Sequence, residues 1–316
     1  MRRILKTAVS GVLIVLSLLL LLETSFSCQS QETAPTQSAT VEKGKSFIWK
    51  ISSDTTSVYL LGSVHIASQE LYPLDKTIED AFESADYLVV EVNTNNISQD
   101  YAVQLLMKYG TYSQGDGFKE NVPEDLYNKL DKQFKKYGIG LALLDEFRPF
   151  VIYNMMSQFI LEGLGYKGEY GIDLYFMGKA EKSNIIIMEL ETTEFQMDLL
   201  SSIPDAIMML ALQYDIDNPE TEKYLQELFN AWADGDAEKM ETIVFEALIE
   251  EPDMAPYYEK MYDQRNFNMT QKIEEYLADD EIYFIVVGAG HMVGENGLIN
   301  LLKNKGYDVE QLYDSD

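Results

Sequence analysis

The chain has 316 residues, 46% of them hydrophobic, and a formal net charge of −29 at pH 7. A protein this acidic repels phosphate backbones and anionic lipid headgroups, which argues against nucleic-acid binding and against charge-driven attachment to a membrane. The chain contains one cysteine, which excludes an internal disulfide.

Residues 1–27 predict an export signal. Arg2, Arg3 and Lys6 precede an apolar stretch over residues 11–22. This stretch has 12 residues, fewer than the roughly 20 that span a bilayer, so we expect a cleaved signal rather than a permanent membrane helix. The mature protein is therefore expected outside the cytoplasm.

The cysteine, Cys28, directly follows this signal, at the position of the lipid-carrying cysteine of bacterial lipoproteins. Such signals usually carry leucine where this chain has Ser25, and Ser25 with Ser27 would also suit ordinary cleavage and free secretion. We favour the lipid anchor, because a free thiol after export would otherwise have no explanation. Residues 28–45 predict a flexible tether, and residues 46–316 the folded domain.

Four short apolar runs rich in β-branched or aromatic residues predict buried strands. They are Val58–Leu61, Tyr87–Val92, Ile185–Leu190 and Ile282–Val287. Helical patterns separate them, and the interval from about 196 to 278 contains helical patterns but no convincing strand. The sequence thus predicts an α/β protein with a mostly parallel central sheet and a helical insertion over about 196–278.

The chain's two histidines, His65 and His291, occupy matching positions. Each follows a predicted strand and has a glycine three places earlier, Gly62 and Gly288 respectively. One Gly-x-x-His is a weak motif, compatible with a histidine that only caps a strand, but its repetition favours a shared site for proton transfer or metal binding. These glycines and Gly290 would permit close ligand approach, or alternatively supply positive φ at an ordinary turn.

Acidic residues end the other two predicted strands. Glu91 ends one, and Glu189 and Glu191 alternate at the end of the other, which predicts that these two share a face. Because ligands of open α/β sheets bind at the carboxyl ends of strands, we expect these groups to share one cavity with the histidines. Two imidazoles with one or two carboxylates suit Zn, Mn, Co or Fe, and a spare glutamate could act as general base.

Arg265 interrupts the apolar stripe of a predicted helix. It could steady a site carboxylate or a substrate carbonyl, or its stem could extend along the edge of the core, and spacing alone does not decide between these.

Several segments, taken in this order, resemble the TraB/PrgY/GumN family, which includes the Tiki membrane metalloproteases of animals. They lie within about residues 46–313 and comprise Leu60-Leu-Gly62-Ser-Val-His65, the strand with Glu91, Gly171-Ile-Asp173, Leu190-Glu191-Thr-x-x-x-Gln196, Arg265-Asn266-x-x-Met269 and Gly288-Ala-Gly-His291. The resemblance implies an erythromycin-esterase- or ChaN-like fold with two pseudo-related halves, each giving one Gly-x-x-His. It also implies divalent-metal-dependent peptidase activity in the Tiki branch, with Mn or Co favoured.

Carried over by position, the resemblance makes His65 and His291 metal ligands or catalytic bases and Glu91 the catalytic carboxylate. Glu191 becomes the second acidic position, with Arg265 and Asn266 supporting the site. In this family PrgY-like members are associated with blocking peptide pheromones, and ChaN-like relatives with haem.

We therefore expect an exported, lipid-anchored hydrolase of peptides or related amides. His65, His291 and Glu91 would surround a divalent metal (Mn, Co or Zn), with Glu191 orienting a ligand or carrying a proton. One alternative is a surface lipoprotein that sequesters a peptide or haem without turnover. Another is a structural envelope lipoprotein, in which substituting either histidine would change little beyond stability.

Overall fold

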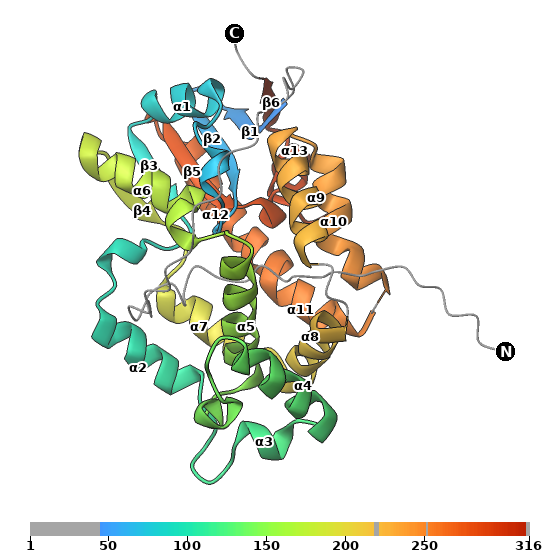
Figure 1. Ribbon diagram of the computed structural model, residues 1–316. Coiled ribbons are helices and arrows are strands. Elements are labelled where there is room, and N and C mark those ends of the chain that lie inside the picture. Colours follow the sequence, from blue (N-terminus) through green and yellow to red (C-terminus); the bar gives the residue numbers. More distant parts are fainter. Residues whose placement is uncertain (1–44, 218–220, 251, 314–316) are drawn as a thin grey trace, which may run out of the picture.

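A computed structural model describes residues 45–217, 221–250 and 252–313. The predicted export signal, Cys28 and all but the last residue of the predicted tether lie outside the described residues. Figure 1 shows two stacked parts, an upper part built around a sheet and a lower part built from helices.

Six strands form one mixed sheet in the order β4-β3-β5-β2-β1-β6. Strands β4, β3, β5 and β2 lie next to one another in this order and run parallel. Strand β1 pairs antiparallel with both β2 and β6. The bounds are β1 Lys45–Ser52, β2 Ser57–Ser63, β3 Tyr87–Val90, β4 Ile186–Glu189, β5 Tyr283–Gly288 and β6 Asp308–Tyr313. The predicted α/β class and its four parallel strands are confirmed, whereas β1 and β6 were not predicted.

The finer prediction of two pseudo-related halves is not confirmed. The strands that precede the two histidines, β2 and β5, are direct neighbours in the single sheet, with Ser63 opposite Gly288. The prediction that β4 is buried on both faces is wrong, because β4 is an edge strand and the side chain of Ile186 is 60% exposed. The next two residues of this strand, Ile187 and Met188, are only half-buried.

Helices cover both faces of the sheet. Figure 1 shows α1 (Lys76–Glu83) and α6 (Ile172–Ser183) on one side, and α9 (Thr221–Ala233), α10 (Ala237–Glu250) and α13 (Leu298–Asn304) on the other. On the first side, the rings of Phe82 and Phe176 pack 5.5 and 4.8 Å from that of Phe284 in β5. On the second side, the Trp232 indole donates a hydrogen bond to the Gly62 carbonyl at 2.6 Å. Both contacts fix the strands that precede the site.

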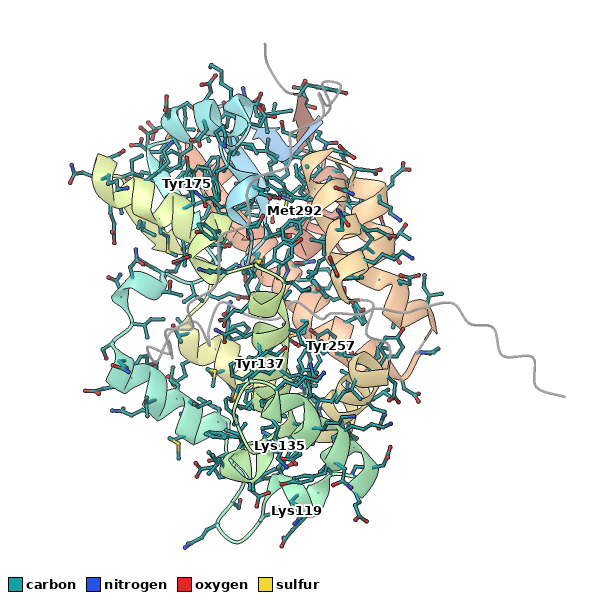
Figure 2. The ribbon with its side chains drawn as sticks, in the orientation of Figure 1. Lys119, Lys135, Tyr137, Tyr175, Tyr257 and Met292 are labelled. Atoms are coloured by element: carbon teal, nitrogen blue, oxygen red, sulfur yellow. The ribbon has the colours of Figure 1, made fainter. Side chains whose placement is uncertain are left out.

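The lower part has its own hydrophobic core, which includes Phe150, Tyr153, Leu212 and Tyr257. Figure 2 labels Tyr257 among the helices of this part, and its side chain is fully buried. Its helices are α2 (Gln99–Tyr109), α3 (Phe118–Asn121), α4 (Glu124–Lys135), α5 (Pro149–Gly163), α7 (Thr193–Ser201), α8 (Asp205–Asp217) and α11 (Ala255–Tyr258).

After α11 the helix continues as a π-helical turn, η7 (Glu259–Asp263), and then as α12 (Gln264–Leu277), which leads back to β5. No strand occurs between β4 and β5 in the part of this interval that the structure describes. Across the described ranges, no single helix is long and apolar enough to cross a membrane. Taken together, α7 and α8 would be long and apolar enough, but their axes meet at a bend of 85°.

Candidate functional site at the carboxyl ends of the strands

The carboxyl ends of β2, β3 and β5 bring His65, Glu91 and His291 together. A Cβ atom built on Gly288 would lie 3.3 Å from His65 Nε2, 3.4 Å from Glu91 Oε1 and 3.7 Å from His291 Cδ2. All three groups therefore border one point in space, although the two histidines are more than two hundred positions apart. The parallel direction of these strands explains this, because the carboxyl ends of parallel strands lie at the same edge of the sheet.

A carboxylate holds the first histidine. His65 Nδ1 lies 2.8 Å from Asp173 Oδ2, and the Ser63 hydroxyl donates to Asp173 Oδ1 at 3.1 Å. Asp173 is the second residue of α6. Because Nδ1 is committed to Asp173, the Nε2 nitrogen is the one that faces the Gly288 position.

An amide holds the second histidine. His291 Nδ1 lies 2.6 Å from Asn266 Oδ1, and Asn266 Nδ2 donates to the Asn296 carbonyl at 2.8 Å. The side-chain carbonyl oxygen of Asn266 can only accept a hydrogen bond, so neutral His291 carries its proton on Nδ1. The lone pair of His291 Nε2 then faces the site. That nitrogen lies 3.9 Å from Glu91 Oε1.

Arg265 binds two carboxylates in the interior. The side chains of Arg265, Glu91 and Glu191 are only 6%, 7% and 4% exposed. Arg265 Nη2 donates to Glu91 Oε2 and, at 2.7 Å, to Glu191 Oε2, while Nε donates to Glu191 Oε1 at 2.8 Å. Of the two sequence interpretations, the structure supports the arginine that steadies site carboxylates. Buried charges of this kind require such pairing.

Both oxygens of Glu191 accept hydrogen bonds from buried side chains. Gln196 in α7 donates to Glu191 Oε2 at 2.9 Å and to Glu91 Oε2 at 3.3 Å. The prediction that Glu189 and Glu191 share a face is wrong: Glu189 is exposed and accepts from the Asn93 backbone at 2.6 Å, whereas Glu191 is buried. Since β4 ends at Glu189, the two-residue alternation of a strand does not extend to Glu191.

The motif glycines make space and do not supply positive φ, because none of Gly62, Gly288 and Gly290 has positive φ. A Cβ on Gly62 would lie 2.5 Å from the Phe47 ring, and one on Gly290 would lie 2.6 Å from the Tyr262 ring. Gly288 instead faces the polar site, and its backbone amide donates to Glu91 Oε1 at 2.6 Å.

The two imidazoles differ in charge. Burial lowers the pKa of His65, but the charge and hydrogen bond of Asp173, together with Glu91, outweigh this and raise it to about 9. For His291, burial and the Arg265 charge lower the pKa to about 3. Burial also raises the pKa of Glu91, yet Arg265 and both histidines hold it well below its usual range. At neutral pH the metal-free site therefore contains a cationic His65, a neutral His291 and an ionised Glu91.

The donors fit a divalent metal in type. Two imidazole Nε2 nitrogens border one carboxylate oxygen, and partners on both Nδ1 atoms are the usual outer support of metal-bound histidines. Within the described ranges, however, no group of three or more His, Cys, Asp or Glu side chains has a geometry that could hold a metal ion. His65, His291 and Glu91 are therefore a candidate ligand set by chemistry and position.

Three residues near the site were not assigned a role from the sequence. Asp173 and Gln196 belong to segments that carried the family resemblance, so a signal was present without an assigned partner. Tyr262 gave no separate signal, because it fell within the apolar stripe of its helix, yet its ring lies 5.3 Å from that of His291.

A mixed sheet covered by helices, with ionisable groups at the ends of its parallel strands, defines an α/β protein with a candidate active site at the usual position. A family model described as "TraB/PrgY/gumN family" matches residues 47–311. The chain belongs to the TraB/PrgY/gumN family.

Comparison with curated proteins finds relatives of two kinds. "Uncharacterized protein YbaP" of Escherichia coli K12 is 23% identical over 246 residues, which cover 78% of this chain and 87% of YbaP. "Metalloprotease TIKI1" of Xenopus tropicalis is 20% identical over 313 residues, or 84% of this chain and 61% of TIKI1. "Metalloprotease TIKI homolog" of Nematostella vectensis is 19% identical and is covered over 66% of its length. The chain thus spans roughly six-tenths of the TIKI proteins it matches.

Proposed function

We propose that the protein is a divalent-metal-dependent hydrolase of peptides or related amides. The observation that supports this most strongly is the convergence of His65, Glu91 and His291 around Gly288. Membership of a family with relatives named as metalloproteases favours the same chemistry. The ionised groups are buried at substantial energetic cost, which favours a functional site over a passive core.

In this proposal His65, His291 and Glu91 would hold the metal, which when bound polarises a carbonyl and lowers the pKa of a water molecule. Water adds to the carbonyl carbon, the C–N bond breaks, and the amine leaves with a proton that comes from that water. Asp173 and Asn266 keep the Nε2 atoms aimed at the site.

The other charged residues have supporting roles. Arg265 keeps Glu91 ionised and in place, Glu191 holds Arg265, and Gln196 donates to both carboxylates. Because both oxygens of Glu191 are bonded, we assign it to positioning rather than to proton transfer. Glu91, with its lowered pKa, is likewise a poor proton acceptor, so its role is to supply negative charge.

Cleavage of a quenched fluorescent peptide library, with EDTA or with added Mn, Co or Zn, tests the proposal. We expect metal-dependent cleavage that His65→Ala and Glu91→Gln abolish. Asp215→Asn is the matched control for the second variant, because Asp215 is also buried but accepts a hydrogen bond from Tyr153 in the lower part. No cleavage under any metal would overturn the proposal, and retained peptide binding would then support the sequestering alternative.

Metal binding provides a second test. Metal analysis should find about one ion per wild-type chain and none in the His65→Ala/His291→Ala double variant. Because His65 must release its proton to bind through Nε2, affinity should rise as pH increases toward about 9. Affinity that falls over this range would argue against His65 as a ligand.

We also propose that the protein is exported and anchored by a lipid on Cys28. The apolar stretch at residues 11–22, followed by the chain's single cysteine, supports this. Metabolic labelling with an alkyne fatty acid should mark the wild-type protein and not Cys28→Ser. Release of unlabelled wild-type protein into the medium would favour ordinary secretion.

A further inference from the structure

Tyr262 occupies the wall of the site beside His291. It lies in the π-helical turn η7, a distortion that is frequent at functional sites. Its ring packs 5.3 Å from the His291 ring and 5.8 Å from that of Tyr258. A Cβ on Gly290 would lie 3.1 Å from the Tyr262 hydroxyl, so the absence of a side chain at Gly290 gives this ring its place.

The other polar side chains that carry donors around the site each make at least one hydrogen bond within the protein. Arg265 donates from Nε, Nη1 and Nη2 to Glu191, the Met261 carbonyl and Glu91. The side-chain amides and the backbone amide that face the site are also bonded, namely Gln196 to Glu91 and Glu191, Asn266 to the Asn296 carbonyl, and Gly288 to Glu91.

The Tyr262 hydroxyl differs from these groups. The Tyr262 side chain is partly exposed, and its hydroxyl makes no hydrogen bond to another group within residues 45–217, 221–250 and 252–313. The neighbouring Tyr258, one turn earlier, instead donates its hydroxyl to the Val244 carbonyl at 2.9 Å. Of these two stacked tyrosines, only Tyr262 retains a donor for a ligand.

We propose that Tyr262 is a catalytic residue whose phenol donates a hydrogen bond to the carbonyl oxygen of the bound amide. This inference rests on the proposed hydrolase function. When water adds to the carbonyl carbon, negative charge develops on that oxygen, and a fixed donor stabilises it. With both Nε2 atoms assigned to the metal, Tyr262 differs from Arg265, Gln196, Asn266 and Gly288 in having no hydrogen-bond partner among the described residues. The phenol keeps its proton throughout and forms no covalent bond.

The test compares Tyr262→Phe with Tyr258→Phe in the full-length protein. Both changes remove one phenolic oxygen from stacked rings four positions apart, and Tyr258→Phe breaks a bond outside the site. For the cleaved library peptide with added Mn, we expect Tyr262→Phe to lower kcat by about 100-fold and to change KM little, as for loss of one oxyanion donor. Tyr258→Phe should stay within about twofold of wild-type kcat once thermal melts confirm folding.

A binding measurement separates this inference from the proposed function. Acetohydroxamate presents an amide-like carbonyl, and calorimetry with added Mn should show that Tyr262→Phe binds it about tenfold more weakly than Tyr258→Phe. If Tyr262→Phe retains both kcat and hydroxamate affinity while His65→Ala is inactive, the inference is wrong and the hydrolase stands. If the wild-type protein cleaves nothing but the two variants still differ tenfold in hydroxamate affinity, carbonyl recognition by Tyr262 stands and the hydrolase function does not. If wild type neither cleaves nor binds acetohydroxamate, both are wrong.

Discussion

The two Gly-x-x-His loops have the same spacing but different surroundings. Asp173 holds His65 from α6 of the sheet-containing part, whereas Asn266 holds His291 from α12. Gly62 lies beneath the Phe47 ring in the core, and its counterpart Gly288 faces the site. The repeated motif therefore fixes where each imidazole lies, while Asp173 raises the pKa of His65, and burial with the Arg265 charge lowers the pKa of His291.

The largest expected effect concerns Glu91, the carboxylate that both loops share. Replacing Arg265 with methionine leaves two buried carboxylates without the guanidinium that binds them both, and we expect a loss of about 3–5 kcal/mol in the free energy of unfolding. Urea denaturation measures this. Arg148→Met is the control, because the Arg148–Asp205 pair is more exposed and its loss should be smaller. Equal losses would mean that burial of the Arg265 pairs adds nothing.

The pH dependence of stability should separate the two loops in metal-free protein. The folded state binds the His65 proton more tightly than the unfolded state, so its stabilisation is complete below the ordinary pKa of 6.5 and is lost as pH rises through about 9. The folded state binds the His291 proton more weakly, so stability is complete above pH 6.5 and is lost as pH falls toward about 3. Each shift corresponds to a stability change on the order of 3 kcal/mol.

Urea denaturation of the protein in EDTA at pH 5, 7 and 9 tests these opposite directions. Relative to wild type, His65→Gln should flatten the alkaline limb and His291→Gln the acidic limb. Using differences between variants removes contributions shared by the rest of the chain. Flattening of the same limb by both variants would contradict the asymmetry.

Exchanging the partner types sharpens the comparison. Asp173→Asn should lower the pKa of His65 by about 1–3 units, and Asn266→Asp should raise that of His291 by a similar amount. Because the chain has two histidines, NMR titration of an untagged metal-free protein should resolve both imidazoles. Unchanged values in both variants would show that overall burial, and not the partner, sets the charges.

The motif glycines give the smallest expected effects on stability. Gly62→Ala should destabilise the protein by about 1–3 kcal/mol, because the new methyl group overlaps the buried Phe47 ring. Gly288→Ala has room by comparison and should change stability less, but its methyl group would occupy the point between His65 Nε2 and Glu91 Oε1. Calorimetry should then show lost metal binding for Gly288→Ala and retained binding for Gly62→Ala. The reverse pattern would refute the distinction.

The sequence predicts the parallel strands because each is an apolar run, and for β2, β3 and β5 such a run matches burial between the helices, whereas β4 is an edge strand. It does not predict β1 and β6, because β1 adjoins the polar tether and β6 alternates between half-buried and exposed residues. The position of both histidines at strand ends followed from the same reasoning, since parallel strands end at one edge of the sheet.

The partners of the histidines were harder to predict. Asp173 is 108 positions from His65, and no local pattern links the two. Arg265 stood out because it is charged within an apolar stripe, whereas Tyr262 in the same stripe is typical of an ordinary core. A single sequence thus reveals unusual residues, but it does not reveal ordinary residues in unusual roles.

The pairing of Glu91 with Arg265 joins residues 174 positions apart. During synthesis, the first strands of the sheet emerge long before the guanidinium that neutralises this carboxylate. A nascent chain that ends before α12 would contain Glu91 and Glu191 without the Arg265 guanidinium that binds both in the finished protein. The site must therefore assemble late. Fragments that lack residues 264–291 should consequently be digested by proteases faster than the full-length protein.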